Sequence, residues 1–483
     1  MPAPPHPPRV TGGALKRLLD CERRLWLSEH ARERAAARTE HDDVLGERNR
    51  SLEDAVAAAV PGLAGPLFHP GVSFDEAAAE TLRLLRESSR PLRRPVLVSA
   101  DGRHTATPAF ILREGEALVI RDVRLAHRPE TKRENRVRVA YAAWLARQLT
   151  GREVARLEIV NGLGQVVEVA AEPDAALAAL AARTLELMGD APEPDLLLAH
   201  SHCQHCAHYT HCWDRAEAER RIEVVPLVTR ARAALLHAEG VRTFDELAAR
   251  TPESLRHHDL KAHAPLLLAE ARAWATGAPV WLRDPGLPRD RTPVWFDVES
   301  DSDGERATVP VYLWGLAVER ETPRAEAVLA ELDDAGDRDA WRRFVSRALE
   351  VFREEPRAIW VHWHDAEPMW LERYIARLGA PEEFVSRVRA PGALFDLHRS
   401  LERSVRLPLR STSIKFVAPW LGFEWSNPEA DAAWSTAQLH RAYETADVDE
   451  RAQLLAQVAA YNADDLWAMR VVWRWLAAAP GRA

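Results

Sequence analysis

The sequence predicts a multidomain α/β protein. The chain has 483 residues, more than a single hydrophobic core usually organises, so several domains are expected. Segments with helical periodicity alternate with short β-like segments, which is typical of α/β folds. A Pro-rich stretch, RDPGLPRDRTP, precedes the last β-like segments and marks a boundary. We therefore expect three domains, at residues 1–222, 223–285 and 286–483.

Amino-acid composition and net charge limit the classes of function that the chain can have. Apolar residues make up 47% and charged residues 28% of the chain, as in globular proteins. The N-terminus, MPAPPHPPRVTGG, lacks the apolar core of a signal peptide, and no apolar run reaches the length of a membrane span. We expect a cytoplasmic protein with no membrane association. With a net charge of −9, any nucleic-acid binding must use local grooves.

The first region reads as helices around a small sheet. Apolar spacing predicts helices at 14–31 and 73–89, followed by a β-like segment at 116–126. A further helix at 133–149 precedes a hairpin-like segment at 151–170. A last helix, 174–188, leads into a cysteine-rich stretch.

The middle region, 222–280, is compactly helical. HAEGVRTFDELAAR resembles half of a helix-hairpin-helix unit, with Gly240-Val241 at the tight turn and Thr243 as N-cap. Such hairpins offer backbone N–H groups to DNA phosphates without reading sequence. An ordinary two-helix linker with the same cap explains the pattern equally well.

The last region begins with two buried-looking strands, VWFDVES and RAIWVHW, and continues with long helices. In the first strand, Asp297 and Glu299 stand two residues apart, so both carboxylates lie on one face and are able to share a cation. The second strand leads into His362-x4-Glu367, and AYNADDLWAM gives Tyr461-x3-Asp465 at the start of a helical run. The spacing puts that phenol and carboxylate on one helix face.

The four cysteines are Cys21 and the set in CQHCAHYTHC, namely Cys203, Cys206 and Cys212. Three thiolates at this spacing suit a metal or an iron–sulfur cluster with Cys21 as fourth ligand. Zinc stays open as an alternative because histidines crowd the motif at positions 202, 205, 208 and 211.

One upstream cysteine followed by Cys-x2-Cys-x5-Cys resembles the iron–sulfur clasp of RecB-like nucleases, including CRISPR-associated and AddB-type members. The resemblance covers roughly residues 10–220 and implies a restriction-endonuclease-type α/β domain whose four cysteines hold a 4Fe-4S cluster.

The resemblance to RecB-like nucleases also implies a PD-(D/E)xK metal site with a following Gln-x3-Tyr helix. Here the first acid position is Ala109, the second motif reads Asp122-Val123-Arg124, and the helix keeps Tyr141 but has Val137 for Gln. Arginine is no simple substitute for the lysine. We expect this domain to serve DNA binding or structure.

The motifs of the last region, in their order, resemble those of DEDD-type 3′–5′ exonucleases, which implies an RNase H-like α/β fold with a mixed sheet. This resemblance implies that Asp297, Glu299, Glu367 and Asp465 bind two Mg²⁺ or Mn²⁺ ions and that Tyr461 orients the attacking water. The second motif departs from the family pattern with Trp363, Ala366 and Glu367. Asp365 is an alternative third acid, but it is out of phase with Trp370-Leu371, which favours Glu367.

Together the two halves resemble bacterial proteins that join a RecB-like domain to an RNase H-like domain. Within that resemblance, Asp396 and Lys415 are candidate substrate-groove residues; Lys415 is one of only four lysines. The implied activity is exonucleolytic hydrolysis of DNA or RNA, with single-stranded DNA or 3′ ends as substrate and DNA repair as setting. The alternative function is a non-catalytic nucleic-acid-binding adaptor for a helicase or repair complex, with both sites vestigial.

Overall fold

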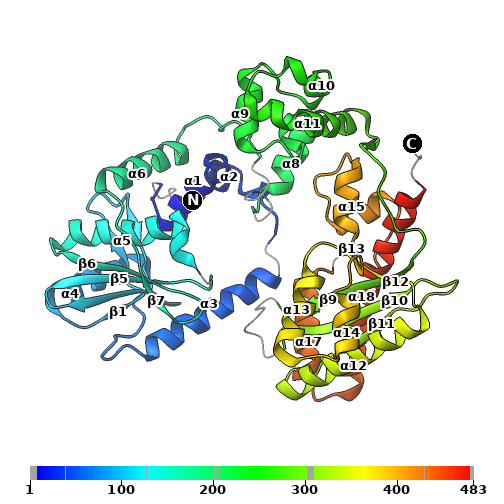
Figure 1. Cartoon of the computed structure of the whole chain (residues 1–483). Coiled ribbons are helices and arrows are strands. Elements are labelled where there is room, and N and C mark those ends of the chain that lie inside the picture. Colours follow the sequence, from blue (N-terminus) through cyan, green and yellow to red (C-terminus); the bar gives the residue numbers. More distant parts are fainter. Residues whose placement is uncertain are drawn as a thin grey trace. The chain divides into compact units, whose positions relative to one another are not determined.

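The computed structural model describes residues 8–37, 40–126, 128–198, 203, 206–301, 309–428 and 430–478, with the side chains of 40–45 excepted. The chain separates into two compact units, Met1–Ala218 and Glu219–Ala483 (Figure 1). The finer division into three domains stays a prediction. Among the described residues, no helix is both long enough and apolar enough to cross a membrane.

The first unit is a mixed α/β structure with these elements: α1 (Gly12–Asp20), α2 (Glu22–His30), α3 (Glu40–Ala58), α4 (Phe74–Glu87), β1 (Leu92–Arg93), β2 (Leu97–Val98), β3 (Thr105–Ala106), β4 (Phe110–Glu114), β5 (Ala117–Val123), α5 (Arg133–Thr150), β6 (Val154–Val160), β7 (Val166–Glu168), α6 (Asp174–Met188) and α8 (Tyr209–Ala218). Its main sheet has the order β1-β4-β5-β6-β7. Only β5 and β6 pair in parallel, because α5 connects them, and this helix is buried along most of its length.

The structure confirms several predicted elements of the first unit but not the long helix predicted at its start. β5, α5 and the β6–β7 hairpin lie where the sequence predicts them. The helix expected at 14–31 is instead broken in two. Cys21 adopts an extended backbone with φ −171° and ψ 125°, ending α1 and preceding α2. Apolar spacing alone did not reveal this break because the helical period continues on both sides of it.

The second unit begins with short helices, α9 (Arg230–Ala238) and α10 (Phe244–Ala248), and the longer α11 (His258–Thr276). Gly240 has a φ of 78°, the left-handed conformation that the tight turn requires. Thr243 caps α10 together with Glu246 in a reciprocal capping box, so the predicted turn and N-cap are both confirmed.

The remainder of the second unit is a three-layer structure. Its elements are β8 (Val280–Trp281), β9 (Thr292–Ser300), β10 (Val311–Val318), β11 (Glu326–Leu329), α12 (Asp334–Glu354), β12 (Ala358–His362), α13 (Ala366–Leu378), α14 (Glu382–Val388), β13 (Leu394–Asp396), α15 (Leu397–Ser404), β14 (Val405–Arg406), α16 (Ile414–Trp420), α17 (Ala432–Glu444) and α18 (Val448–Ala477). The five-stranded sheet has the order β11-β10-β9-β12-β13. β9 pairs antiparallel with β10 and parallel with β12, so the sheet is mixed, as predicted.

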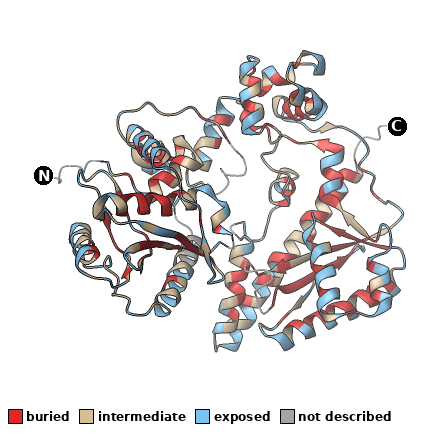
Figure 2. Ribbon diagram, turned by 60° about the vertical axis from the view of Figure 1, so that its left-hand side comes forward, coloured by how far each residue is buried: buried red, intermediate tan, exposed pale blue. Residues whose placement is uncertain are grey.

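Strand alternation divides the core of this sheet into two faces. Val294 and Phe296 of β9 pack toward α12, α13 and α14, whereas Trp295 packs toward α15, α16 and α18. The central strands are buried on both sides, and Figure 2 shows them as a continuous buried layer between helices. Asp297 and Glu299 share the parity of Trp295, so they lie on the face covered by α18.

Candidate active site

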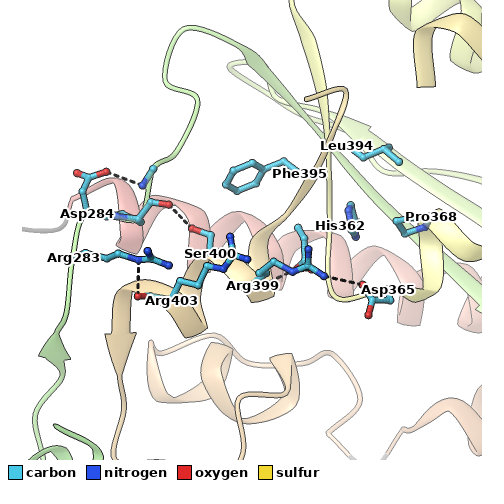
Figure 3. Close-up of a pocket in the computed structure, with 13 residues that line it drawn as sticks. Arg283, Asp284, His362, Asp365, Pro368, Leu394, Phe395, Arg399, Ser400 and Arg403 are labelled. Atoms are coloured by element: carbon cyan, nitrogen blue, oxygen red, sulfur yellow. Dashed lines mark hydrogen bonds and ion pairs between the residues drawn. The ribbon is translucent and has the colours of Figure 1, made fainter. Parts of the chain in front are cut away.

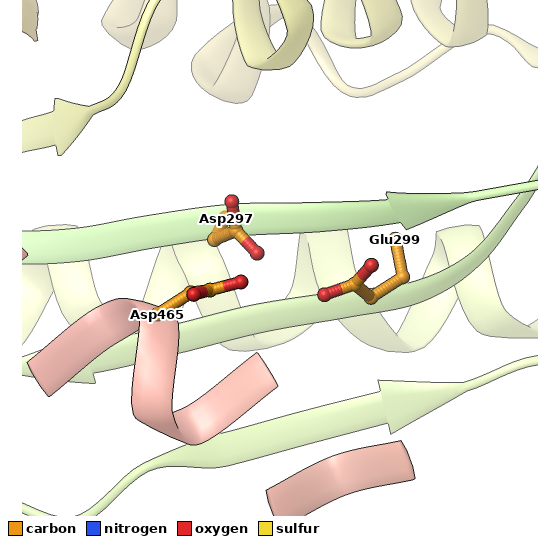
Figure 4. A group of neighbouring side chains, drawn as sticks. All are labelled: Asp297, Glu299 and Asp465. Carbon is orange, nitrogen blue, oxygen red and sulfur yellow. The ribbon is translucent and has the colours of Figure 1, made fainter. Parts of the chain in front are cut away.

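Three carboxylates from β9 and α18 converge on one face of the sheet. One oxygen from each of Asp297, Glu299 and Asp465 lies within 4.8 Å of the others (Figure 4). Within the described parts of the chain, this is the only group of three or more His, Cys, Asp or Glu side chains gathered so closely. Carboxylate oxygens are the ligands that Mg²⁺ and Mn²⁺ prefer, so the donor set fits a divalent ion.

Helix α18 supplies the third carboxylate from its middle. Asp447 caps the helix by accepting hydrogen bonds from the backbone N–H groups of Asp449 and Glu450. The helix therefore starts at Val448, well before Tyr461, so the predicted helix start at the Tyr-x3-Asp motif is wrong. The pair Tyr461 and Asp465 still lies one helical turn apart and faces the same site.

Asn462 links the two acids of β9, a contact that the motif analysis missed. Its amide Nδ2 donates to Asp297 Oδ2 at 2.6 Å and lies 3.4 Å from Glu299 Oε1. Gly315 of β10, paired with Asp297, leaves the space for this side chain, because a Cβ there would lie 1.7 Å from Asn462 Oδ1. A glycine inside the apolar strand VYLWGLAV was the available signal.

Asp465 is enclosed by a cation and aromatic rings. Its Oδ1 accepts hydrogen bonds from Lys415 Nζ at 2.7 Å and from Trp425 Nε1 at 3.1 Å. The same ammonium lies 4.4 Å from the ring centroid of Trp425 and 4.4 Å from that of Tyr461. Lys415, a candidate groove residue from the sequence, thus contacts the acid site itself.

Asp464 faces away from the other acids and has a separate task. Its Oδ2 accepts hydrogen bonds from Ser426 N at 2.8 Å and from Ser426 Oγ at 2.6 Å. These bonds fasten the loop after α16 to α18, and that loop carries Trp425. The carboxylate next to Asp465 therefore positions the tryptophan that contacts it.

The structure brings Glu367 to the site and leaves Asp365 outside. Glu367 stands in the first turn of α13 and its side chain is 4% exposed, whereas the Asp365 side chain is 69% exposed and lies 3.5 Å from Arg399. The carboxyl groups of Glu367 and Asp297 lie close enough to share a proton, which contributes to the raised pKa of Asp297. Glu367 Oε2 is buried without a hydrogen-bond partner among the described residues, although His362 Nδ1 lies 3.6 Å away. An unsatisfied buried carboxylate oxygen is costly unless an ion or water binds it.

Burial sets the protonation of these acids. Burial raises the pKa of Asp297 well above its usual value, and the neighbouring charges of Glu367 and Asp465 raise it further. Burial raises the pKa of Glu367 to about 8 and also raises that of Glu299. Burial raises the pKa of Asp465 too, against the opposing effect of Lys415. Such a cluster is poorly compensated by protein cations, and a bound divalent ion would favour its ionised form.

His362 helps to line a cavity of about 710 Å³ (Figure 3). Its Nδ1 lies 3.6 Å from Glu367 Oε2, so the cavity adjoins the acid site. Asp396 lines the cavity, accepts from Arg399 N at 2.9 Å and caps α15. Three arginines also line the cavity: Arg283, Arg399 and Arg403. Asp396, the second candidate groove residue, therefore lies in the wall of a cavity with guanidinium groups.

In the first unit, Asp122 has arginine partners. Asp122 Oδ2 accepts from Arg124 Nη2 at 2.6 Å and lies 3.8 Å from Arg138 Nη2. Ala109 is buried against Phe110, Val123 and Val160 and offers no ligand atom. The guanidinium groups of Arg124 and Arg138 thus lie where a metal ion would have to bind Asp122. Tyr141 contributes to the core and lies 3.1 Å from His104 Nδ1.

The cysteines come from opposite ends of the first unit. Burial raises the pKa of the Cys206 and Cys212 thiols, and the thiol of Cys21 is near enough to raise each of them further. Cys203 precedes Cys206, whose N–H donates to the Cys203 carbonyl at 2.9 Å. Among the described residues, no three of these thiols lie within 4.8 Å of one another, so they do not form a compact single-ion site here.

Comparisons with known proteins bear on the second unit. Residues 294–477 match the family model of the RNase H superfamily. No curated protein matches the chain. The matched segment begins at the strand of Asp297 and Glu299 and ends with the helix of Asp465, so it contains every acid of the site. The second unit therefore contains an RNase H-like domain, and the four acids belong to it.

Proposed function

We propose that the chain is a metal-dependent nuclease that hydrolyses DNA or RNA phosphodiesters from the 3′ end by a two-metal mechanism in its RNase H-like domain. The proposal rests on the convergence at Asp297 of Glu299, Asp465 and Glu367, four acids that come from three separate elements. An RNase H superfamily domain with clustered acids supports a nuclease-type function and a divalent metal.

The acids divide naturally between two ions. Asp297, Glu299 and Asp465 would hold one ion, since their oxygens already lie within 4.8 Å of one another. Asp297 with Glu367 would hold the other, which would satisfy the unpartnered Oε2 of Glu367. When bound, the two ions activate water as a nucleophile and stabilise the charge on the leaving oxygen.

The chain's own groups would align the reactants. Burial raises the pKa of Tyr461, so its phenol stays protonated and acts through hydrogen bonding to the attacking water. Asn462 would hold Asp297 and Glu299 at a fixed separation while the ions exchange. Tyr461 also lies beside Lys415, which supplies positive charge where a phosphate would approach.

The first unit would support binding or structure, since Asp122 is paired with arginines. We further propose that Cys21, Cys203, Cys206 and Cys212 hold a 4Fe-4S cluster. The thiol of Cys21 is near enough to those of Cys206 and Cys212 to raise the pKa of each, and this supports the assignment. A four-iron cluster is larger than a single ion and holds its thiolates farther apart, so the absence of a compact single-ion group is compatible with it.

The test uses the full chain and a single-stranded oligonucleotide of DNA, and one of RNA, labelled in turn at each end. With Mn²⁺ present, a 5′ label should give a ladder of shortened products, and a 3′ label should appear at once as a mononucleotide. EDTA should stop both. Metal-independent binding without cleavage of DNA or RNA would favour the adaptor function instead.

A further inference from the structure

Lys415 is held directly against one of the candidate metal ligands. It stands in the first turn of α16, and its Nζ donates to Asp465 Oδ1 at 2.7 Å. The oxygen that receives this bond also accepts the indole N–H of Trp425. Two donors therefore occupy an oxygen that belongs to a carboxylate of the acid group.

The ammonium is caged. Aromatic rings of Trp425 and Tyr461 each lie 4.4 Å from Nζ, within the range of cation–π attraction. Hydrogen bonds from Ser426 to Asp464 hold the loop that carries Trp425 against α18, and these bonds help to fix the position of the Trp425 ring. The Lys415 side chain remains 32% exposed, whereas that of Asp465 is 13% exposed. This placement differs from a surface lysine, which remains fully hydrated and mobile.

An ammonium and a divalent ion compete for the same carboxylate. Both are attracted by its negative charge and repel each other, and the repulsion is strong at the few ångströms that separate adjacent sites. Binding of a divalent ion to Asp465 must therefore weaken the bond to Lys415. The freed ammonium would still lie between Trp425 and Tyr461, next to the acids, where a substrate phosphate would need a cation.

We propose that Lys415 is a built-in counter-ion of the acid site: it neutralises Asp465 before the divalent ion binds, and it then passes to the phosphate of the nucleic-acid substrate. This inference rests on the proposed function of the acids as a metal centre. Removing the ammonium should strengthen metal binding and weaken substrate binding. A lysine that merely braces Asp465 would give no gain in metal affinity when removed.

The first experiment titrates Mn²⁺ calorimetrically into the metal-depleted full chain. Lys415→Met should bind Mn²⁺ about tenfold more tightly, the size expected for one charge interaction in a partly exposed site. Lys415→Arg keeps the charge and should stay near the parent affinity. Lys261→Met, at an exposed position on α11, is the matched control and should leave Mn²⁺ affinity unchanged. All four proteins share the same cysteines, so differences between them report on the acid site.

The second experiment measures fluorescence anisotropy of a labelled phosphorothioate oligonucleotide at saturating Mn²⁺. Lys415→Met should bind it about tenfold more weakly, and Lys415→Arg should be close to the parent. Lys415→Gln provides a second neutral variant should the methionine variant fold poorly. Mn²⁺ affinity that falls or stays equal in both neutral variants would overturn this inference alone. A parent chain that binds no Mn²⁺ would overturn the proposed metal centre as well.

Discussion

A glycine and an asparagine facing each other across two elements set the spacing of the first two acids. Asn462 reaches Asp297 and Glu299 only because Gly315 has no side chain. Gly315→Ala should displace the asparagine, lower stability by about 1–3 kcal/mol and reduce kcat at least tenfold. Thermal denaturation and single-turnover kinetics measure the two effects.

Gly65 offers the control for that substitution, since a Cβ built there meets no atom within 4 Å. Gly65→Ala should change neither quantity appreciably. Full activity and full stability in Gly315→Ala would show that Asn462 does not position the acids.

Two acids at the start of α13, the N-cap residue Asp365 and the first-turn residue Glu367, provide a second comparison. Glu367→Gln replaces a carboxyl group that contacts Asp297 and would hold a metal ion, and it should lower kcat by about 100-fold or more. Asp365→Asn alters an exposed side chain and should change kcat by less than about threefold. Steady-state rates on one oligonucleotide suffice, and equal losses in the two variants would contradict the assignment of Glu367.

The spacing of residues within a motif predicts which acid faces the site, but it does not predict which other side chains contact that acid. Glu367 and Asp465 follow from their spacing relative to Trp370 and Tyr461. The contacts of Asp465 with Lys415 and Trp425 span 50 and 40 residues and depend on how α16 packs against α18. No local pattern encodes such contacts, so the sequence marked Lys415 only as a groove residue.

At the scale of elements, α11 contains a buried acid whose protonation affects stability. Glu270 accepts from Leu227 N at 2.9 Å, and burial raises its pKa from 4.5 to about 7. In the unfolded chain this carboxyl loses its proton at lower pH than in the folded chain. Unfolding therefore releases a proton between about pH 4.5 and pH 7, and rising pH favours the unfolded state across this window.

Glu270→Gln keeps an acceptor for Leu227 and removes this penalty. The variant should match the parent near pH 4.5 and should be more stable at pH 8, by on the order of 3 kcal/mol. Urea denaturation at the two pH values measures the difference. A stability difference that is the same at both would contradict the raised pKa.

Under the proposed cluster, Cys21 is linked to the three cysteines near the other end of the first unit. If the four cysteines hold one cluster, Cys21→Ala should lower the iron and sulfide content and the melting temperature as much as Cys206→Ala does. Each substitution removes one of the four thiolate ligands of the same cluster. Anaerobic purification with iron and sulfide analysis tests this directly. Colourless protein with stoichiometric zinc, or unchanged metal content in Cys21→Ala, would contradict it and favour a histidine ligand.

For the molecule as a whole, the sequence predicts the α/β class and the mixed sheet of the last region. Strand alternation at VWFDVES and apolar burial in RAIWVHW are local signals, and β9 and β12 lie there. The break at Cys21 and the true start of α18 did not follow from periodicity, since a helical period continues through a single extended residue and does not mark a cap.

We propose that chemistry takes place in the RNase H-like domain and not at the paired Asp122 of the first unit. Asp297→Ala and Asp122→Ala, compared on one 5′-labelled single strand with Mn²⁺, test it most directly. Asp297 contacts the other acids and would bridge both ions, so its loss should lower the rate by several orders of magnitude. Asp122→Ala should leave the rate within about twofold of the parent, since Arg124 already occupies that carboxylate. Both variants should still bind the strand, because phosphate contacts come from other groups. Loss of cleavage in Asp122→Ala with full cleavage in Asp297→Ala would instead place the active site in the first unit.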